Sequence, residues 1–263
     1  MSDADRSADT RDNEPDITSR RGFLGVAAVA MGGSLLAGGV RLIEVQAATP
    51  ASPAAGATAG ANPTVRWGLL IDSDKCASGC TDCVTACNTE NGLATPQRPT
   101  DAQWIRKVEI KEIKTGRSAS LPVMCQHCAE PPCVDVCPTG ASFKRADGIV
   151  MVDRHSCIGC RYCVMACPYQ ARSFIHEALT EQKPEVPRGK GCVESCTLCV
   201  HRIDQGQQNT ACAEACTKAG HNAISFGNLN DPDSEISRRA RAAATTQLRA
   251  DLRLDLGVRY QGL

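Results

Sequence analysis

Sixteen of the 17 cysteines in this chain of 263 residues fall into four groups of four. The two central groups have the spacings C-x2-C-x4-C-x3-C-P and C-x2-C-x2-C-x3-C-P. In the second spacing, three close thiolates hold one [4Fe-4S] cubane and the fourth reaches the neighbouring cluster. The prolines that follow, Pro138 and Pro168, fix the direction in which the backbone leaves each loop. The spacing therefore predicts four [4Fe-4S] clusters, one for each group.

The two outer groups flank the central pair with spacings C-x3-C-x2-C-x3-C and C-x2-C-x12-C-x3-C. Because the central groups follow one another in tandem, we expect the outer groups to pair around them, as two nested two-cluster units. Ligation crossed within each pair then predicts four ligand sets. The inner sets are Cys125, Cys128, Cys133 and Cys167, and Cys157, Cys160, Cys163 and Cys137. The outer sets are Cys76, Cys80, Cys83 and Cys216, and Cys196, Cys199, Cys212 and Cys87.

Other uses of cysteine fit this pattern less well. Zinc sites rarely have the continuous spacing C-x2-C-x2-C-x3-C, and a redox dithiol would explain one C-x2-C pair only. Disulfides, which an exported cysteine-rich protein would ordinarily suggest, fit poorly because three or four thiols would converge on one point. Cys192 is the seventeenth cysteine. We interpret it as a buried or spare thiol, and leave open its use as an alternative ligand.

Several basic residues lie close to the cysteines in sequence. His127 and His201 are placed to donate N–H bonds to sulfur or to add charge, and neither is predicted to be a ligand. Capping a loop is the plainer interpretation of both. Arg161 and Arg172 would either offset cluster charge or lie in solvent.

The composition also limits the fold and the function. Aromatic residues make up only 3% of the sequence, so few large side chains are available for a core. We expect metal–thiolate bonds to supply much of the order, since metal-binding free energy becomes folding free energy when the unfolded protein has no site. Cluster-free protein should then be largely unfolded, which a cooperative far-UV CD melt would contradict. A formal net charge of zero argues against a nucleic-acid-binding surface.

The sequence has no G-x-G-x-x-G, P-loop, H-E-x-x-H or C-x2-C-H motif. We therefore predict an electron carrier with no catalytic residues and no covalent haem of its own. A competing hypothesis is an enzyme subunit that reduces a sulfur compound at a cluster with an open iron. Four cysteines at each cubane argue against that. A structural zinc scaffold is the third hypothesis, and it would be colourless where a cluster protein is brown.

The N-terminus indicates an export signal. Ser19-Arg20-Arg21-Gly22-Phe23-Leu24 is typical of a twin-arginine signal and begins an uncharged stretch that ends at Val40. Residues 1–47 are predicted to be the signal peptide, with an uncleaved anchor as the alternative. The twin-arginine route exports folded proteins, which suits a protein whose clusters are inserted in the cytoplasm. Residues 48–64, rich in Ala, Pro, Gly and Thr, are predicted to be a disordered linker.

An α+β fold with short β-hairpins is predicted for the remainder. Strands are expected at 65–72, 104–113, 171–176 and 223–227, and a hairpin at 141–152 around Asp147-Gly148. The four-cluster domain is expected at 65–233, with the outer pair in 65–121 and 192–227 and the inner pair in 122–178. The polar loop at 181–191 is expected to contact a partner or to cover a site. Residues 234–263 are predicted to be a docking tail, helical from the N-cap Ser234 to about Asp255.

The second cysteine group carries a specific resemblance. Cys125-Gln126-His127-Cys128, Pro131-Pro132-Cys133 and Cys137-Pro138-Thr139-Gly140-Ala141 resemble the second motif of the four-cluster ferredoxin subunits of membrane redox complexes. Residues 83–91 and 199–202 are similar to the first and fourth motifs of that family. The resemblance runs from about Trp67 into the tail. Asn88 and Thr217 replace the prolines of the general pattern, which we expect to affect loop geometry more than ligation.

Finer features are similar to the periplasmic iron–sulfur subunits of sulfite-reductase-linked transmembrane complexes. These are the C-x3-C opening, the approach Gly191-Cys192-Val193-Glu194-Ser195-Cys196, and the twin-arginine signal without a C-terminal membrane helix. The alternative is a subunit of a polysulfide, tetrathionate or nitrite reductase complex. The resemblance implies a periplasmic subunit of a hetero-oligomer, peripheral to the inner membrane. It would pass electrons between a quinone-reactive membrane subunit and another redox partner, for which a periplasmic multihaem cytochrome c is a candidate.

Overall fold

The computed structural model describes residues 61–263 of the chain. The predicted signal peptide, residues 1–47, and most of the predicted linker, residues 48–64, lie outside the described residues. None of the helices in the described part combines the length and the apolar character that a membrane crossing needs.

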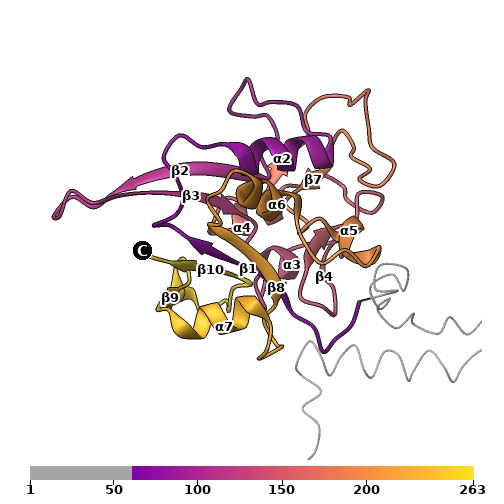
Figure 1. The fold of residues 1–263 in the computed structure, drawn as a ribbon. Coiled ribbons are helices and arrows are strands. Elements are labelled where there is room, and N and C mark those ends of the chain that lie inside the picture. The colour runs from indigo at the N-terminus through magenta and orange to yellow at the C-terminus, as the bar shows by residue number, and fades with distance from the viewer. Residues whose placement is uncertain (1–60) are drawn as a thin grey trace, which may run out of the picture. The chain divides into compact units, whose positions relative to one another are not determined.

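A four-stranded sheet joins the beginning and the end of the described residues (Figure 1). Its strands are, in order across the sheet, β8 (Ile224–Asn228), β1 (Trp67–Asp72), β10 (Val258–Gln261) and β9 (Thr245–Thr246). Strand β1 runs parallel to β10 and antiparallel to β8, and Leu69 lies opposite Val258 on one side and Phe226 on the other. The apolar run Leu69-Leu70-Ile71 is fully buried, as expected for a strand covered on both faces. The two predicted strands that became β1 and β8 are confirmed.

The C-terminal tail is helical over a shorter stretch than predicted. Helix α7 spans Glu235–Ala242, and the Ser234 side chain caps it by accepting a hydrogen bond from the Ser237 N–H. The prediction of a helix to about Asp255 is wrong. Beyond the helix the chain contains a 3-10 turn, η1 (Ala250–Leu252), which is flanked by residues with positive φ. The positive-φ residues are Arg249, Arg253 and Asp255.

The end of the tail belongs to the core. Tyr260 in β10 is fully buried, and its hydroxyl donates a hydrogen bond to the Pro122 carbonyl at 3.1 Å. The Gly257 N–H donates to the Gln126 carbonyl at 2.9 Å, which attaches the tail to the second cysteine loop. Sheet hydrogen bonds and apolar burial explain why this segment is a strand, since an Arg-rich helix in solvent would gain neither.

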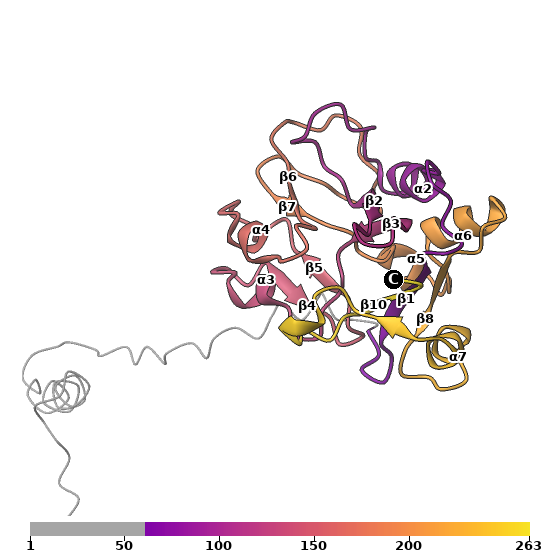
Figure 2. The ribbon, with the colours of Figure 1, turned by 90° about the vertical axis from the view of Figure 1, so that its left-hand side faces the viewer.

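Five short helices accompany the cysteine groups. In the central groups a proline follows the fourth cysteine, and the helix there is shorter than the one at the fourth cysteine of the outer groups, which lack this proline. They are α2 (Asp82–Asn91), α3 (Pro132–Asp135), α4 (Tyr162–Ala166), α5 (Val200–Asp204) and α6 (Ala211–Lys218). In the central groups, Pro138 and Pro168 follow the fourth cysteine, and α3 and α4 stop after four and five residues. Asn88 and Thr217 occupy the same place in the outer groups, so α2 and α6 continue through it to 10 and 8 residues. These two longer helices pack against each other although they are distant in sequence (Figures 1 and 2).

The other strands form two-stranded antiparallel sheets. They are β2 (Ile105–Lys111) with β3 (Ser118–Met124), β4 (Ser142–Lys144) with β5 (Val150–Val152), and β6 (Ser173–Phe174) with β7 (Val193–Glu194). The β2–β3 hairpin extends away from the body of the domain (Figure 1). The hairpin predicted at Asp147-Gly148 is confirmed as β4–β5, with Gly148 at φ 85° in the turn. The predicted α+β class with short hairpins is therefore confirmed for the described residues.

A buried ion pair connects three loops beside the cysteine groups. Arg188 and Glu194 are both less than 10% exposed and lie 2.6 Å apart, Nη2 to Oε1. The Trp104 indole N–H also donates to Glu194, at 3.0 Å, and Arg188 donates to the Gly92 carbonyl at 2.8 Å. The carboxylate of Glu194 therefore satisfies two buried donors at once.

We expect Glu194→Ala to lower the free energy of unfolding by about 3–5 kcal/mol, because it leaves the guanidinium of Arg188 buried without its counter-charge. Denaturant titration of the anaerobically purified holoprotein, followed by far-UV CD, measures the loss. The matched control is Glu177→Ala, which breaks the exposed pair with Arg98 and should move the midpoint little. Equal shifts in the two variants would contradict this account.

Candidate metal centres

The four cysteine loops share one backbone feature. The residue directly before the second cysteine has a left-handed conformation in every group: Gly79 (φ 73°), His127 (φ 44°), Gly159 (φ 70°) and Leu198 (φ 52°). The left-handed region costs about 1–2 kcal/mol for a residue with a Cβ atom. His127 and Leu198 adopt this conformation in spite of that cost. Each loop therefore needs the turn in order to curl around the point on which its thiols converge. The two glycines, Gly79 and Gly159, are the only signal for this turn in the sequence, and the turn was not predicted.

The fourth cysteine of every group accepts an N–H hydrogen bond at sulfur. In the second group the donor is the Ser142 backbone, at 3.3 Å from Cys137. The equivalent bonds run from the Ala171 backbone to Cys167 (3.5 Å), from the Ala223 backbone to Cys216 (3.2 Å) and from the Asn91 amide to Cys87 (3.5 Å). Burial opposes ionisation of Cys137, but the N–H bonds led by Ser142 lower the pKa of this thiol. Such bonds stabilise sulfur in its thiolate form, which is the form that binds iron.

One small pocket brings the first and fourth groups together. Cysteines from both groups line it, namely Cys76, Cys80, Cys83 and Cys216. Burial raises the pKa of the Cys83 thiol to about 11, and the ammonium of Lys107, which also lines the pocket, opposes this shift. The Lys107 ammonium donates to the Ala77 carbonyl at 2.9 Å, so its position is fixed beside the thiols.

A second set of four thiols lies next to the first. Cys87 neighbours Cys199 and Cys212, and Cys196 neighbours Cys87, Cys199 and Cys212. Burial, reinforced by repulsion among these sulfurs, raises the pKa of Cys87 and Cys196 well above the ordinary value. Cys83 of the first set also neighbours Cys212 of the second. The two outer sets are therefore adjacent.

In the inner groups too, the fourth cysteine of one group lies near thiols of the other group. Cys125, Cys128 and Cys133 all neighbour Cys167 from the third group. Cys163 neighbours Cys157 from its own loop and Cys137 from the second group. Cys160 lies partly exposed in that loop. Burial, first of all, raises the pKa of Cys125 and of Cys128 to about 12, so these thiols are neutral until a metal displaces the proton.

The two arginines close to the cysteines in sequence differ in their exposure to solvent. Arg161 is exposed, and its guanidinium lies 5.0 Å from the centre of the Phe174 ring. Arg172 is only 5% exposed and lies among the thiols of Cys133, Cys125 and Cys163. Arg161 is thus a surface residue, whereas Arg172 belongs to the inner sites.

The two singled-out histidines also differ. His127 is buried, and its Nδ1 accepts a hydrogen bond from the Val150 N–H at 3.0 Å, which places the proton of the neutral ring on Nε2. Burial, with a contribution from Arg172, lowers the pKa of His127 to about 3. His201 instead pairs with Glu90 in α2, at 2.7 Å. It helps to hold α5 against α2.

A three-residue clamp supports the second outer set. Glu90 accepts hydrogen bonds from Arg202 at 2.6 and 2.7 Å, and Arg202 also donates to Glu214 in α6 at 2.9 Å. The bonds from Arg202, ahead of those from His201, lower the pKa of Glu90 to about 2. The clamp ties α2, α5 and α6 together around the thiols of Cys87, Cys199 and Cys212.

Cys192 lies outside the four sets. It neighbours Cys157, and its Sγ donates to the Arg154 carbonyl at 3.3 Å. It is partly exposed, which fits the spare thiol of the first interpretation. None of the cysteines, all of which lie in the described residues, forms a disulfide.

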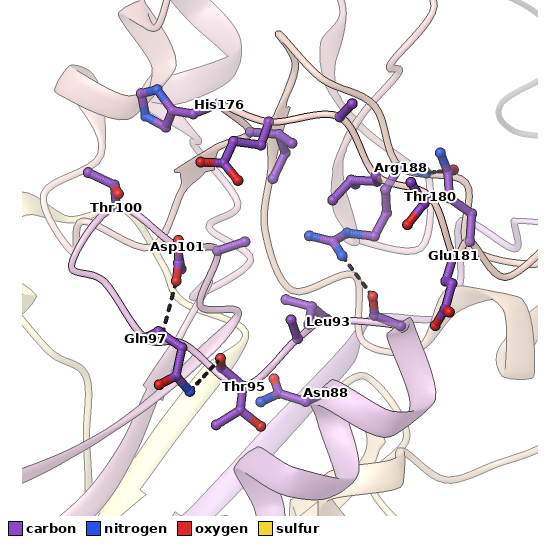
Figure 3. Close-up of a pocket in the computed structure, with 18 of the residues that line it drawn as sticks. Asn88, Leu93, Thr95, Gln97, Thr100, Asp101, His176, Thr180, Glu181 and Arg188 are labelled. Carbon is purple, nitrogen blue, oxygen red and sulfur yellow. Dashed lines mark hydrogen bonds between the residues drawn. The ribbon is translucent and has the colours of Figure 1, made fainter.

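One cavity of the described residues has no cysteine in its lining. It measures about 880 Å³ and opens between residues 88–102 and 174–188 (Figure 3). Polar side chains line it, including His176, Glu181 and Arg188, and the Arg188 guanidinium reaches across to the backbone beside Leu93. The loop that was predicted to contact a partner or cover a site forms one wall. This hollow is separate from the cysteine sets.

The side chains present fit [4Fe-4S] clusters. In three of the sets, three thiols of one group lie near one thiol of another group, and in the remaining set Cys137 lies near Cys163. N–H donors point at the sulfurs of the fourth cysteines. Arg172 has three buried nitrogens without a hydrogen-bond partner in the described residues, and His127 has one. Unpartnered buried donors beside thiols are what clusters with acceptor sulfides would satisfy.

Comparisons with known proteins agree with this chemistry. A family model described as "4Fe-4S dicluster domain" matches residues 116–228, which contain the second, third and fourth cysteine groups. The iron-sulfur subunit 1 of the Hdr-like menaquinol oxidoreductase of Archaeoglobus fulgidus is 43% identical over 225 residues, covering 75% of this chain and 84% of that protein. The chain therefore belongs to the 4Fe-4S ferredoxin-type proteins, and its cofactors are [4Fe-4S] clusters.

Two further relatives place it more closely. The B subunit of the tetrathionate reductase of Salmonella typhimurium is 41% identical over 179 residues, 67% of this chain and 63% of that protein. Protein NrfC of Escherichia coli is 40% identical over 183 residues, 69% of this chain and 74% of that protein. Within the class, the protein is one of the iron–sulfur electron-transfer subunits of membrane redox complexes. The predicted resemblance to the ferredoxin subunits of membrane redox complexes is confirmed, and the protein transfers electrons without being the catalytic subunit.

Proposed function

We propose that the protein is a periplasmic electron-transfer subunit of the DsrO type, which is the iron–sulfur subunit of sulfite-reductase-linked transmembrane complexes. It would carry electrons through four [4Fe-4S] clusters between a quinone-reactive membrane subunit and a second redox partner, in a complex of sulfur metabolism. The observation that carries this proposal is the gathering of Cys76, Cys80, Cys83 and the distant Cys216 around one pocket. That arrangement would extend a two-cluster fold to four sites.

The proposed ligands are the sixteen grouped cysteines in the crossed sets predicted from their spacing. Neighbouring thiols favour Cys167 as the fourth ligand beside Cys125, Cys128 and Cys133, and Cys137 as the fourth beside Cys157, Cys160 and Cys163. They favour Cys87 as the fourth beside Cys196, Cys199 and Cys212. The outer unit, residues 65–121 with 192–227, would then enclose the inner unit, residues 122–178.

Each bound cluster would accept and release one electron. The protein's own residues do three things for that step. Burial of the thiols excludes water, N–H groups such as that of Ser142 stabilise the thiolates, and Lys107 and Arg172 supply positive charge. Because these groups are fixed before the electron arrives, little reorganisation is needed, which favours fast transfer.

Export and membrane attachment are part of the proposal. Arg20-Arg21 would direct residues 1–47 to the twin-arginine route, and partner subunits would hold the folded domain at the inner membrane. The relative named as a menaquinol oxidoreductase subunit supports a quinone-linked partner. A periplasmic multihaem cytochrome c is the candidate for the second partner.

A second candidate function is electron transfer in a tetrathionate, polysulfide or nitrite reductase complex. The identities of 41% to the tetrathionate reductase B subunit and of 40% to NrfC favour it. The two candidates differ in the protein at the other end of the electron path. A haem protein would support the DsrO type, and a large molybdenum subunit would support the alternative.

Purification of the tagged full-length protein from native membranes tests the proposal. We expect a multi-span membrane subunit to co-purify, and a menaquinol analogue to bleach the visible absorbance of the clusters in the complex but not in the isolated protein. A haem spectrum in the complex would support the DsrO type. Clusters that a quinol does not reduce in the intact complex would contradict a quinone-linked role.

A further inference from the structure

Three arginines of the described residues are at least nine-tenths buried, and two of them have acidic partners. Arg145 lies 3.0 Å from Asp147 and 2.7 Å from Asp204, and Arg188 lies 2.6 Å from Glu194. Arg172 is as buried as Arg145, at 5% exposed. The thiols of Cys133 and Cys163 lie close to its guanidinium, but none of its three nitrogens has a partner with hydrogen-bond geometry within residues 61–263. A buried charge without a counter-charge costs several kcal/mol, so Arg172 needs a negative partner that the side chains do not provide.

The surroundings of Arg172 identify that partner. Its titratable neighbours are the thiols of Cys133 and Cys125 on one inner site and of Cys163 on the other. The preceding residue, Ala171, fixes the backbone by donating its N–H to Cys167 at 3.5 Å. The guanidinium therefore lies between the two inner sets. An oxidised [4Fe-4S] cubane with four thiolates has a net negative charge, and reduction adds one more.

The second cysteine group has Ser142 at the position that Arg172 holds in the third. Each follows its fourth cysteine by five residues, and Ser142 is equally buried. The inner pair thus has one arginine for two sites, although the two loops otherwise repeat each other. Arg161, close to the same cysteines in sequence, is exposed and has solvent to screen its charge.

We propose that the guanidinium of Arg172 is the counter-charge shared by the two inner clusters, and that it raises their reduction potentials. This proposal rests on the ligand sets of the proposed function. A fixed positive charge stabilises the reduced cluster more than the oxidised one, because the reduced cluster is more negative. Arg172 acts on the clusters through its fixed positive charge, and is not a ligand. The effect should be larger at the cluster of Cys125 and Cys133, which supply two of its three thiol neighbours.

The test compares Arg172→Met and Arg172→Gln with Arg172→Lys, in the full holoprotein. Redox titration followed by low-temperature EPR reports the potential of each cluster, and iron analysis reports how many remain. We expect both neutral variants to shift the reduction equilibrium of an inner cluster at least tenfold towards the oxidised form. For a one-electron couple, a tenfold shift corresponds to a reduction potential that is about 59 mV lower. The lysine variant should shift it less than threefold. Arg161→Met, the matched control for loss of one positive charge, should also shift it less than threefold.

Neutral variants with full iron and unchanged potentials would overturn the proposal, as would an equal shift in Arg161→Met. If the neutral variants lose the inner clusters while Arg172→Lys keeps them, the requirement for charge is supported. Loss of the inner clusters in all three Arg172 variants would instead mean that the shape of arginine matters, and would overturn the proposal. Failure of the proposed function is distinguishable, because it would appear in the unmodified protein as missing clusters.

Discussion

Replacing Cys216 by serine should remove the cluster that we propose for Cys76, Cys80 and Cys83, although Cys216 lies far away in the sequence. The reason is that Cys216 shares a pocket with those three cysteines, and its sulfur accepts the Ala223 N–H at 3.2 Å. We expect iron to fall from about sixteen atoms per molecule toward about twelve, with one EPR signal lost or converted. Iron analysis and EPR of the anaerobically purified variant measure this.

Two other variants identify the affected cluster. Cys76→Ser should remove the same EPR signal as Cys216→Ser, and Cys196→Ser should remove a different one. Cys192→Ser is the matched control for loss of a thiol outside the four sets, and should keep all four signals. A Cys216→Ser spectrum that matched Cys196→Ser would show that ligation is not crossed.

Ending the protein at Leu256 should prevent folding of the cluster domain. This deletes β10, which lies between β1 and β9 in the central sheet. Burial of Val258 and Tyr260 contributes about 1.5–3 kcal/mol each, and each lost sheet hydrogen bond about 0.5–1.5 kcal/mol. The sum approaches the whole stability of an ordinary domain, which is about 5–15 kcal/mol. The lost bond from Gly257 to Gln126 would also free the Cys125–Cys128 loop.

The yield of brown soluble protein and its iron content measure the effect of this truncation. A protein ending at Gln261 is the control, because it keeps β10 and removes only Gly262 and the exposed Leu263. That control should keep its iron. A protein ending at Leu256 with full iron content would mean that the tail is a separate appendage and not part of the core.

Much of this fold could be predicted from the sequence because cysteine spacing and local strand patterns are short-range signals. Leu69-Leu70-Ile71 and Asp147-Gly148 each identify an element within a few residues. The strand at Val258 could not be found in this way. Its four residues are too few for a periodicity, and its parallel partner β1 lies at the other end of the described residues. The tail was predicted to be helical only to about Asp255, and no element was predicted beyond it, because the pairing of β10 is a tertiary contact.

The sequence predicts cysteine as the ligand type of the site. It does not predict which other side chains are buried beside the cysteines. The sequence indicated that Arg172 lies near cysteines, but it could not separate a buried guanidinium from the exposed one of Arg161. Burial depends on which loops close over a residue. The left-handed turn at Leu198 was equally hidden, because a leucine rarely adopts that conformation without a tertiary constraint.

The central claim is that the cysteines of this protein hold four [4Fe-4S] clusters, and iron and sulfide analysis with low-temperature EPR of the folded, full-length protein tests it most directly. We predict about sixteen irons and sixteen sulfides per molecule, with four EPR signals on stepwise reduction. A colourless protein containing zinc, or one with far fewer irons and its cysteines paired as disulfides, would contradict the claim.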